Sequence, residues 1–444
     1  MLSQLLLSLV CLLGVNSSPF DSNKPITRDV AVLGGGSAGT YAAIALRDAG
    51  VSVVVIEKNN RLGGHANTYT DPTSGLAVDY GVVALGDIPV VHDYFARLGV
   101  TPLVARYDPG NISFFDFKTG RYNPDYVRQD PTDAITRYKE QLAKYPFLDI
   151  TYDLPDEIPD DLLIPWGDFC TKYNLGSGVC RGKLGSGLKA MEIFSLYQHS
   201  IYGSAAKVLG DDVLYGSTVL STDRDNADHE GYHSIVVSQG TNNIAIRAKK
   251  VIATIPPLSS DDFLGPLDLD DVESEIFGKF KHFNYWTSGV HEPAIPAGLN
   301  IQNVSPGNMT TPYSYPDLPA AYFLENTAAP ENYIMTYGTP AGVEKTDGEV
   351  KHEMRATLQR LRNSGYYGKT NGTEDFDIVA FDNHSPYELN VDAEAIRNGF
   401  YHDLYALQGR RDTWYSGAAW VSHDSSAIWN YTAQIVKDVV KTLP

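Results

Sequence analysis

Cysteine is scarce in this sequence, with three residues among 444. Cys11 lies in an apolar N-terminal stretch, which leaves Cys170 and Cys180 for the rest of the chain. So few cysteines exclude a disulfide-rich scaffold. The two remaining cysteines flank a loop that contains Gly and Asn. They are compatible with one disulfide bond, as in proteins of oxidising compartments, or with two free buried thiols.

Basic charge is also in short supply. Lys and Arg number 35 against 54 Asp and Glu, which gives a net charge of −19, and no basic run reverses this balance. An acidic protein repels both nucleic acids and anionic membranes. We therefore expect no nucleic-acid partner. The acidic surface by itself identifies no substrate.

Long hydrophobic runs are missing as well. The N-terminal run, residues 5–13, is apolar apart from Ser8 and too short to span a bilayer, so we expect no membrane span. It has the length of a signal-peptide core, although no Lys or Arg precedes it. We predict that Met1–Ser18 is a secretory signal peptide, with a retained anchor as the alternative. Glycosylation sequons follow at Asn111, Asn303, Asn308, Asn371, Asn383 and Asn430.

Glycine, by contrast, is concentrated in a pattern between residues 29 and 67. A short apolar run ends in Gly34-x-Gly36-x-x-Gly39, a helical pattern follows, and a second apolar run ends at Glu57. The glycines allow a tight turn, close backbone approach to a pyrophosphate, and close helix–strand packing. The helix N-terminus offers N–H groups to phosphates, and the acid can accept from ribose hydroxyls. This pattern predicts a dinucleotide site formed by Gly34, Gly36, Ser37, Ala38, Gly39, Glu57 and Lys58.

The pattern continues as Arg61-Leu62-Gly63-Gly64-His65, and the whole stretch resembles the flavin-containing amine oxidase superfamily. Residues 217–219, 251–257 and 415–418 match further motifs of that superfamily in the same order. The resemblance implies FAD as the cofactor, with the backbone of Val219 at the adenine. It adds a final group of residues to the cofactor site: Arg61, Gly64, His65, Gly81, Tyr415 and Gly417.

Residues 65–82 and 407–420 are similar to the β-cyclopiazonate dehydrogenase family of FAD-dependent oxidoreductases. That similarity implies a secreted or lumenal flavoprotein of fungal secondary metabolism. The chain has His65 where amine oxidases usually carry Arg, and it lacks the C-terminal cysteine that some of them attach to flavin. His65 is therefore the main catalytic candidate, as hydrogen-bond donor, base or covalent attachment point; alternatively it only packs near the cofactor. Lys281, or Lys279, falls near the lysine that amine oxidases keep beside flavin.

We thus expect an α/β protein: a Rossmann-type FAD-binding domain (residues 26–86, 205–265 and 405–444) with a mixed α+β substrate-binding domain inserted (residues 87–204 and 266–404). The expected reaction is hydride transfer from a C–H bond of a small alkaloid- or polyketide-like substrate to flavin N5, reoxidation by O2, and in some cases oxidative cyclisation. An FAD-dependent double-bond isomerase and a non-catalytic FAD-binding protein are the alternatives. The histidine spacing predicts no metal site.

Overall fold

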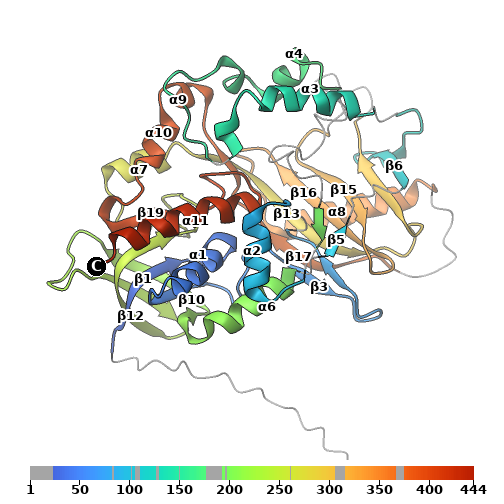
Figure 1. The fold of residues 1–444 in the computed structure, drawn as a ribbon. Coiled ribbons are helices and arrows are strands. Elements are labelled where there is room, and N and C mark those ends of the chain that lie inside the picture. The colour runs from blue at the N-terminus through green and yellow to red at the C-terminus, as the bar shows by residue number, and fades with distance from the viewer. Residues whose placement is uncertain are drawn as a thin grey trace, which may run out of the picture.

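The computed structural model shows two large β-sheets with helices packed around them (Figure 1), and two small sheets of two strands each, β3–β4 and β5–β8. It describes residues 24–82, 85–101, 103–105, 111–126, 130–149, 151–176, 193–195, 198–260, 262–305, 316–366 and 375–444. The predicted signal peptide, Cys180 and the sequons at Asn308 and Asn371 lie outside these ranges. Nothing in the structure bears on those expectations.

The first sheet is built around parallel strands. Its order is β10–β11–β12–β1–β2–β9, and β19 pairs with β12. Residues 30–33 and 53–56 are all buried, and such unbroken apolar runs are typical of parallel strands covered on both faces. The strands are β1 (Ile26–Leu33), β2 (Val53–Ile56), β9 (Val213–Leu214), β10 (Ser217–Asp223), β11 (His233–Gln239), β12 (Asn242–Ala253) and β19 (Thr413–Tyr415).

The second sheet is mostly antiparallel, in the order β17–β13–β16–β15–β14–β6–β7, with β18 paired to β13. The long helix α8 (Asp347–Asn363) begins with a capping box formed by Thr346 and Glu349, and its Met354 and Leu358 belong to this sheet's core. The strands are β6 (Asn111–Asp116), β7 (Arg121–Tyr122), β13 (Lys281–His291), β14 (Leu299–Asn303), β15 (Ala320–Asn326), β16 (Asn332–Thr339), β17 (Asp377–Asn383) and β18 (Tyr387–Asn390).

Helices from the two ends of the chain lie side by side. Figure 1 shows α1 (Ser37–Asp48) along α11 (Ser425–Thr442), and the two helices are in direct contact. Helices α2 (Pro89–Leu98) and α6 (Gln198–Leu209) pack beside them. The remaining elements are β3 (Thr68–Thr70), β4 (Ala77–Asp79), β5 (Leu103–Ala105), α3 (Thr132–Leu142), η1 (Pro146–Asp149), η2 (Asp160–Leu162), α4 (Trp166–Lys172), β8 (Ile193–Ser195), η3 (Gly210–Asp212), α7 (Asp271–Phe277), α9 (Ala393–Arg397), α10 (Phe400–Tyr405) and η5 (Arg410–Asp412).

The core of the first sheet reaches further along the chain than predicted. It includes Phe95 of α2, Ile201 of α6, Phe277 of α7 and Phe400 of α10, all from ranges that we assigned to the substrate lobe. A helical repeat of apolar residues reveals a buried face but not the sheet on which that face packs. For this reason the expected boundaries at residues 87–204 and 266–404 differ from the observed packing.

Helices α3 and α4 form a small separate layer at the top of Figure 1. Their own core contains Tyr138, Phe169 and Cys170. Cys170 is fully buried and disulfide-bonded, which favours the disulfide expectation over free thiols. Its expected partner is not among the described residues.

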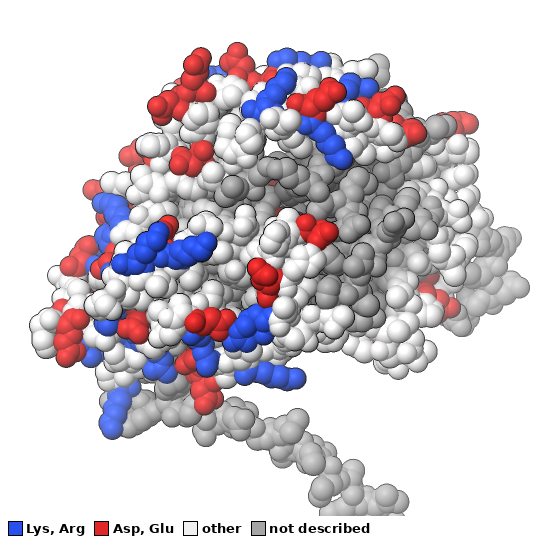
Figure 2. Space-filling model, viewed as in Figure 1, with Lys and Arg blue, Asp and Glu red and all other residues white. Residues whose placement is uncertain are grey.

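The surface carries charges of both signs. On the face in Figure 2, basic and acidic side chains are interspersed rather than gathered in one patch. Within the described ranges, no helix is both long and apolar enough to cross a bilayer.

Candidate active site

The glycine-rich turn after β1 leaves an open space at the start of α1. Gly34 has φ +97°, and a Cβ at Gly39 would lie 1.9 Å from the carbonyl oxygen of Gly34. A Cβ at Gly36, in contrast, would meet no atom closer than the Gly64 Cα at 3.9 Å. The last glycine therefore serves helix–strand packing, whereas the space beside Gly36 is free for a ligand.

The start of α1 suits an anion. Its N-cap, Gly36, supplies no side-chain hydrogen bond, and the first turn holds no acidic residue. The Oγ of Ser37 is buried without a hydrogen-bond partner in the described structure. Unpaired N–H groups, a positive helix end and an orphaned hydroxyl fit the pyrophosphate of a dinucleotide.

Glu57 ends β2 beside this turn. The backbone N–H groups of Gly35 and Asn59 each donate to one carboxylate oxygen at 2.7 Å. Both oxygens keep a further lone pair for a ribose hydroxyl. The Ser217 N–H donates to the carbonyl of Glu57 at 2.9 Å. Val219, the residue expected at the adenine, follows two residues after Ser217 on the same strand. Lys58 is exposed.

The glycine pair brings His65 to the same place. The Gly63 N–H donates to the carbonyl of Gly35 at 2.8 Å, so the second loop lies against the first. Arg61 donates to the carbonyl oxygens of Ala66 at 3.1 Å and Gly64 at 2.9 Å. Arg61 therefore holds the loop in shape, a role that the sequence did not reveal.

Two further segments close the site. A Cβ at Gly81 would lie 1.9 Å from the carbonyl oxygen of His65, so this glycine permits the hairpin β3–β4 to cross the loop. At the other end of the chain, Gly417 has φ +126° and follows Ser416, whose N–H donates to Ala253 at 3.1 Å. The glycine motifs from both chain ends thus lie at the same edge of the first sheet.

Three imidazoles meet beyond this edge. The rings of His65 and His384 stack with centroids 4.3 Å apart and planes 8° from parallel. His384 Nε2 lies 3.1 Å from the Asp382 carboxylate and 3.3 Å from the Thr287 hydroxyl. His423 lies near enough to His384 for their charges to interact, and its Nε2 accepts from a backbone N–H at 2.9 Å.

The environment keeps two of these rings neutral. Desolvation, followed by the charge of His384, lowers the pKa of His65 to about 3 and of His423 to about 4. Both side chains nevertheless remain accessible to solvent. We use the term recess for the solvent-accessible surface at His65 and His423, together with the buried ring of His384 that stacks on His65 behind it.

Tyrosines extend the recess. Tyr285 and Tyr387 stack with centroids 4.6 Å apart, and Tyr387 lies 4.6 Å from the ring of His423. On the other side, burial first and then the charge of Asp382 raise the pKa of Tyr80. The recess therefore combines neutral imidazoles with an aromatic wall, which suits a flat, apolar ligand that also carries polar atoms.

The chain is similar in sequence to a family of known enzymes. Residues 32–98 match the family model described as an NAD(P)-binding Rossmann-like domain. The FAD-dependent oxidoreductase oblC of Cochliobolus heterostrophus is 35% identical over 95% of this chain and 92% of its own length. Beta-cyclopiazonate dehydrogenase of Aspergillus oryzae is 33% identical over 95% of both chains. The chain belongs to this family of FAD-dependent oxidoreductases.

Solved structures agree on the fold. A fatty acid isomerase from P. acnes that produces CLA superposes with a TM-score of 0.70 at 17% identity, over 94% of this chain and 99% of that one. A putrescine oxidase superposes with a TM-score of 0.60 at 17% identity, over 94% and 100%. These structures confirm the expected α/β fold. The relatives at 33–35% identity confirm FAD as the cofactor and membership of the β-cyclopiazonate dehydrogenase family.

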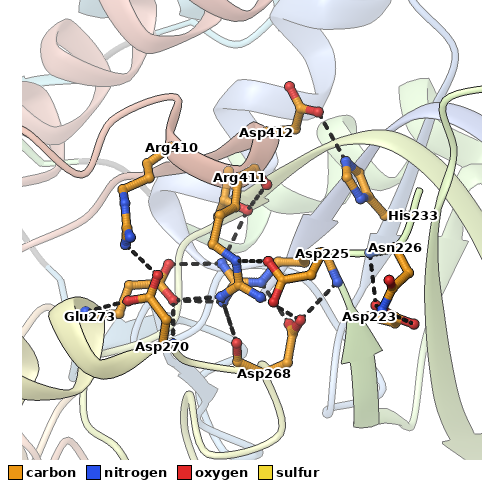
Figure 3. A network of polar contacts seen from close by, with 12 residues as sticks. Asp223, Asp225, Asn226, His233, Asp268, Asp270, Glu273, Arg410, Arg411 and Asp412 are labelled. Carbon is orange, nitrogen blue, oxygen red and sulfur yellow. Dashed lines mark hydrogen bonds and ion pairs between the residues drawn. The ribbon is translucent and has the colours of Figure 1, made fainter.

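One residue that we assigned to FAD in this oxidoreductase points elsewhere. The Tyr415 hydroxyl donates to Glu273 at 2.7 Å. Figure 3 shows Glu273 within an ion-pair network that includes Arg411 and Asp268. There Arg224, whose side chain is fully buried, donates to both oxygens of Glu273 at 3.0 and 2.9 Å, and Arg411 reaches the same carboxylate at 2.9 Å. The hydroxyl of Tyr415 is therefore held in this network by Glu273 and Arg224, and a contact of Tyr415 with FAD stays a prediction.

The lysine expectation is wrong for this family member. Lys281 pairs with Asp392 at 2.7 Å, and 53% of its side chain is exposed. It begins β13, six residues before Thr287, which is roughly 20 Å of extended strand. Lys279 is bound to Glu275 at 3.1 Å on the surface. Neither lysine joins the histidines, because Lys281 lies at the far end of β13 and Lys279 lies on the surface before that strand.

The sequons have different settings. Asn303 is buried, and its side chain bonds the backbone of Phe117 at 3.0 Å and Ala321 at 2.7 Å, which leaves no room for a glycan. The predicted glycosylation of Asn303 is therefore wrong. Asn111 and Asn383 are exposed and Asn430 is partly so, and glycosylation there stays a prediction.

The residues that sequence reasoning missed are His384 and Asp382. They lie two positions apart at the end of β17, so both face the same side of the sheet. An Asp-x-His pattern closing a strand is the signal that could have found them. Asp424, next to His423 in the chain, caps α11 by accepting from the Ala427 N–H at 2.9 Å.

Proposed function

We propose that the protein is a secreted oxidoreductase that removes a hydride from a C–H bond of a small, alkaloid- or polyketide-like secondary metabolite. FAD, when bound, supplies the hydride acceptor at N5, and O2 then restores the oxidised flavin. The observation that carries the proposal is the continuity of two sites. The open space beside Gly36 and Gly64 leads within one residue to His65 and the recess.

The chain's own residues have separate tasks in this proposal. The start of α1 and Ser37 hold the pyrophosphate, and Glu57 holds a ribose. The loop containing His65 and the hairpin behind it present an imidazole to the ring end of the cofactor. Tyr285 and Tyr387 offer an aromatic wall that orients the substrate and excludes water, which strengthens the polar interactions inside.

A related enzyme and the residues of the recess both support this substrate class. A relative at 33% identity is named for β-cyclopiazonate. A recess lined by neutral imidazoles and tyrosines suits a planar, conjugated molecule with a nitrogen or oxygen beside the reacting carbon. Loss of a hydride and of one proton there leaves an imine or enone, and such a product can cyclise when a nucleophile lies within the same molecule.

Two features of the chain support secretion. The apolar run at residues 5–13 has signal-peptide length, and Cys170 is disulfide-bonded, as expected in an oxidising compartment. Expression with and without residues 1–18 in a secreting host tests this point. We expect the full chain in the medium and the shortened chain in the cell; retention of the full chain would contradict secretion.

The catalytic proposal is tested on purified protein. We expect a bound-flavin absorbance spectrum that bleaches under anaerobic conditions with members of a panel of cyclic aromatic amines and conjugated ketones. Admission of air should restore the colour with one O2 consumed and one peroxide formed per turnover. The Gly36→Ala protein is the matched control and should show little flavin. Protein that neither carries nor takes up FAD would contradict the proposal.

The same experiment separates the isomerase alternative. An isomerase returns the hydride to another carbon of the same molecule. It would therefore give a product of unchanged mass with no oxygen consumed.

A further inference from the structure

His384 differs from the other two histidines of the recess because it contacts a carboxylate. Its Nε2 lies 3.1 Å from Asp382 Oδ2 and 3.3 Å from both Thr287 Oγ1 and Asn67 Nδ2. Asn67 Nδ2 also donates to the same oxygen of Asp382. The carboxylate thus collects two donors from two separate segments. The carboxylate can only accept, so the arrangement that satisfies Asp382 puts the hydrogen of the neutral His384 ring on Nε2 and leaves a basic lone pair on Nδ1. Asn67 Nδ2, which is also a donor, then bonds Asp382 rather than the ring.

Asp382 is held in its charged form. Burial by itself would raise the pKa of this carboxyl, but the hydrogen bonds from His384 and Asn67 and the charges of the nearby rings lower it. An ionised carboxylate beside an imidazole stabilises the protonated ring. This is the arrangement by which a carboxylate orients and supports a histidine base in other enzymes.

The other two histidines, His65 and His423, are not protonated near neutral pH. Desolvation and the charge of His384 hold the pKa of His65 near 3 and that of His423 near 4. Tyr80 lies close enough to feel the charge of Asp382, and the ring centroid of Tyr285 lies 6.2 Å from that of His384. His65 and His423 are therefore neutral near pH 7, whereas His384 is the ring that lies beside the ionised carboxylate of Asp382.

We propose that Asp382 and His384 form the proton-accepting pair of this site. The inference rests on the proposed function and adds the fate of the substrate's proton. As the C–H bond breaks and its electron pair leaves as hydride to the cofactor, the neighbouring N–H or O–H bond also breaks. Its electron pair forms the C=N or C=O bond, and its proton goes to Nδ1 of His384. The imidazolium is balanced by Asp382 and later releases the proton to water.

Histidine ring-nitrogen NMR of the FAD-free protein tests the pair without any reaction. We expect His384 to show the Nε2–H tautomer when neutral and to take up the first proton of the cluster. Asp382→Asn should lower the proton affinity of His384 roughly 10- to 1000-fold, because an adjacent opposite charge is lost. Asp377→Asn is the matched control: it lies on the same strand, pairs with Arg355 on the surface, and should change nothing. Proton uptake by His65 or His423 instead would overturn the pair.

Flavin reduction gives the second measurement. His384→Gln keeps a donor for Asp382 but cannot take up a proton, so it also covers the case in which Asp382→Asn does not fold. With an N–H substrate from the panel above, the rate constant of flavin reduction in the His384→Gln protein should fall about 100-fold or more, with little change in KM. The N-methylated analogue of that substrate loses no proton and should react at the wild-type rate. Equal slowing of both compounds would contradict proton acceptance. An unbleached flavin in the wild type would contradict the proposed function, while the NMR result still decides the pair.

Discussion

Replacing Gly36 by alanine separates cofactor binding from folding. Gly36 has φ −72°, a conformation that alanine adopts freely, and the new Cβ would lie 3.9 Å from its nearest neighbour, the Gly64 Cα. The apoprotein should therefore fold normally. Its free energy of unfolding should stay the same or rise by about 0.4–1 kcal/mol, because alanine restricts the unfolded chain.

The affinity for FAD should move in the opposite direction. The added methyl group occupies the space that a pyrophosphate must approach. Overpacking at such a contact costs about 1–3 kcal/mol, which corresponds to roughly 5- to 150-fold weaker binding. The assay is titration of apoprotein, produced under riboflavin limitation, with FAD while the quenching of flavin fluorescence is followed. Urea unfolding of the same apoprotein gives the stability.

Gly39→Ala is the matched comparison, three residues along the same turn. Its Cβ would lie 1.9 Å from the carbonyl oxygen of Gly34, so the helix must move away from the strand. We expect a loss of about 3 kcal/mol or more in the free energy of unfolding. The reasoning would be refuted if Gly36→Ala bound FAD as tightly as the wild type, or if it unfolded as easily as Gly39→Ala.

Further predictions concern the ion pairs. Glu273→Gln removes one of the two carboxylates that pair with the buried Arg224, the other being Asp268, and should lower the free energy of unfolding in urea by about 1–3 kcal/mol. Glu275→Gln, exposed on the same helix, should change it by less than about 0.5 kcal/mol. Equal effects would contradict the buried role of Glu273. Burial would raise the pKa of Asp268, but hydrogen bonds from Thr222 and Arg224 lower it to about 2, so its stabilisation is present above about pH 4 and is lost as the pH falls towards 2. Asp268→Asn should therefore be less stable than the wild type in unfolding experiments at pH 7, and the difference should shrink as the pH falls through 2. Lys281→Met should leave the rate of flavin reduction unchanged, and a large loss would restore its catalytic role.

The cofactor cradle could be predicted from the sequence because its parts are close together in the chain. The turn at Gly34, the packing at Gly39 and the acid at Glu57 belong to one βαβ unit, whose geometry is set by local rules. The structure brings these residues together as expected.

The recess could not be predicted in the same way. His65 meets His384 only because strands β13 and β17 pair across a second sheet, and that pairing depends on distant parts of the chain. The hydrogen-bond partner of the Tyr415 side chain could not be predicted either. Its motif is local, but its partner Glu273 lies on a helix that the sequence did not place. Single polar residues far apart carry no periodicity, so nothing in the one-dimensional pattern connects them.

The meeting of the two chain ends at the cofactor site has a consequence for biosynthesis. The fingerprint around Gly36 is among the first parts of the protein to be made, whereas Gly417 and α11 are among the last. A nascent chain that still lacks α11 has the glycine turn but neither the helix that packs along α1 nor the Trp429 N–H that donates to Ser37 at 3.3 Å. Flavin loading is therefore expected to be a post-translational event, and a premature stop near the end of the message should yield a colourless protein.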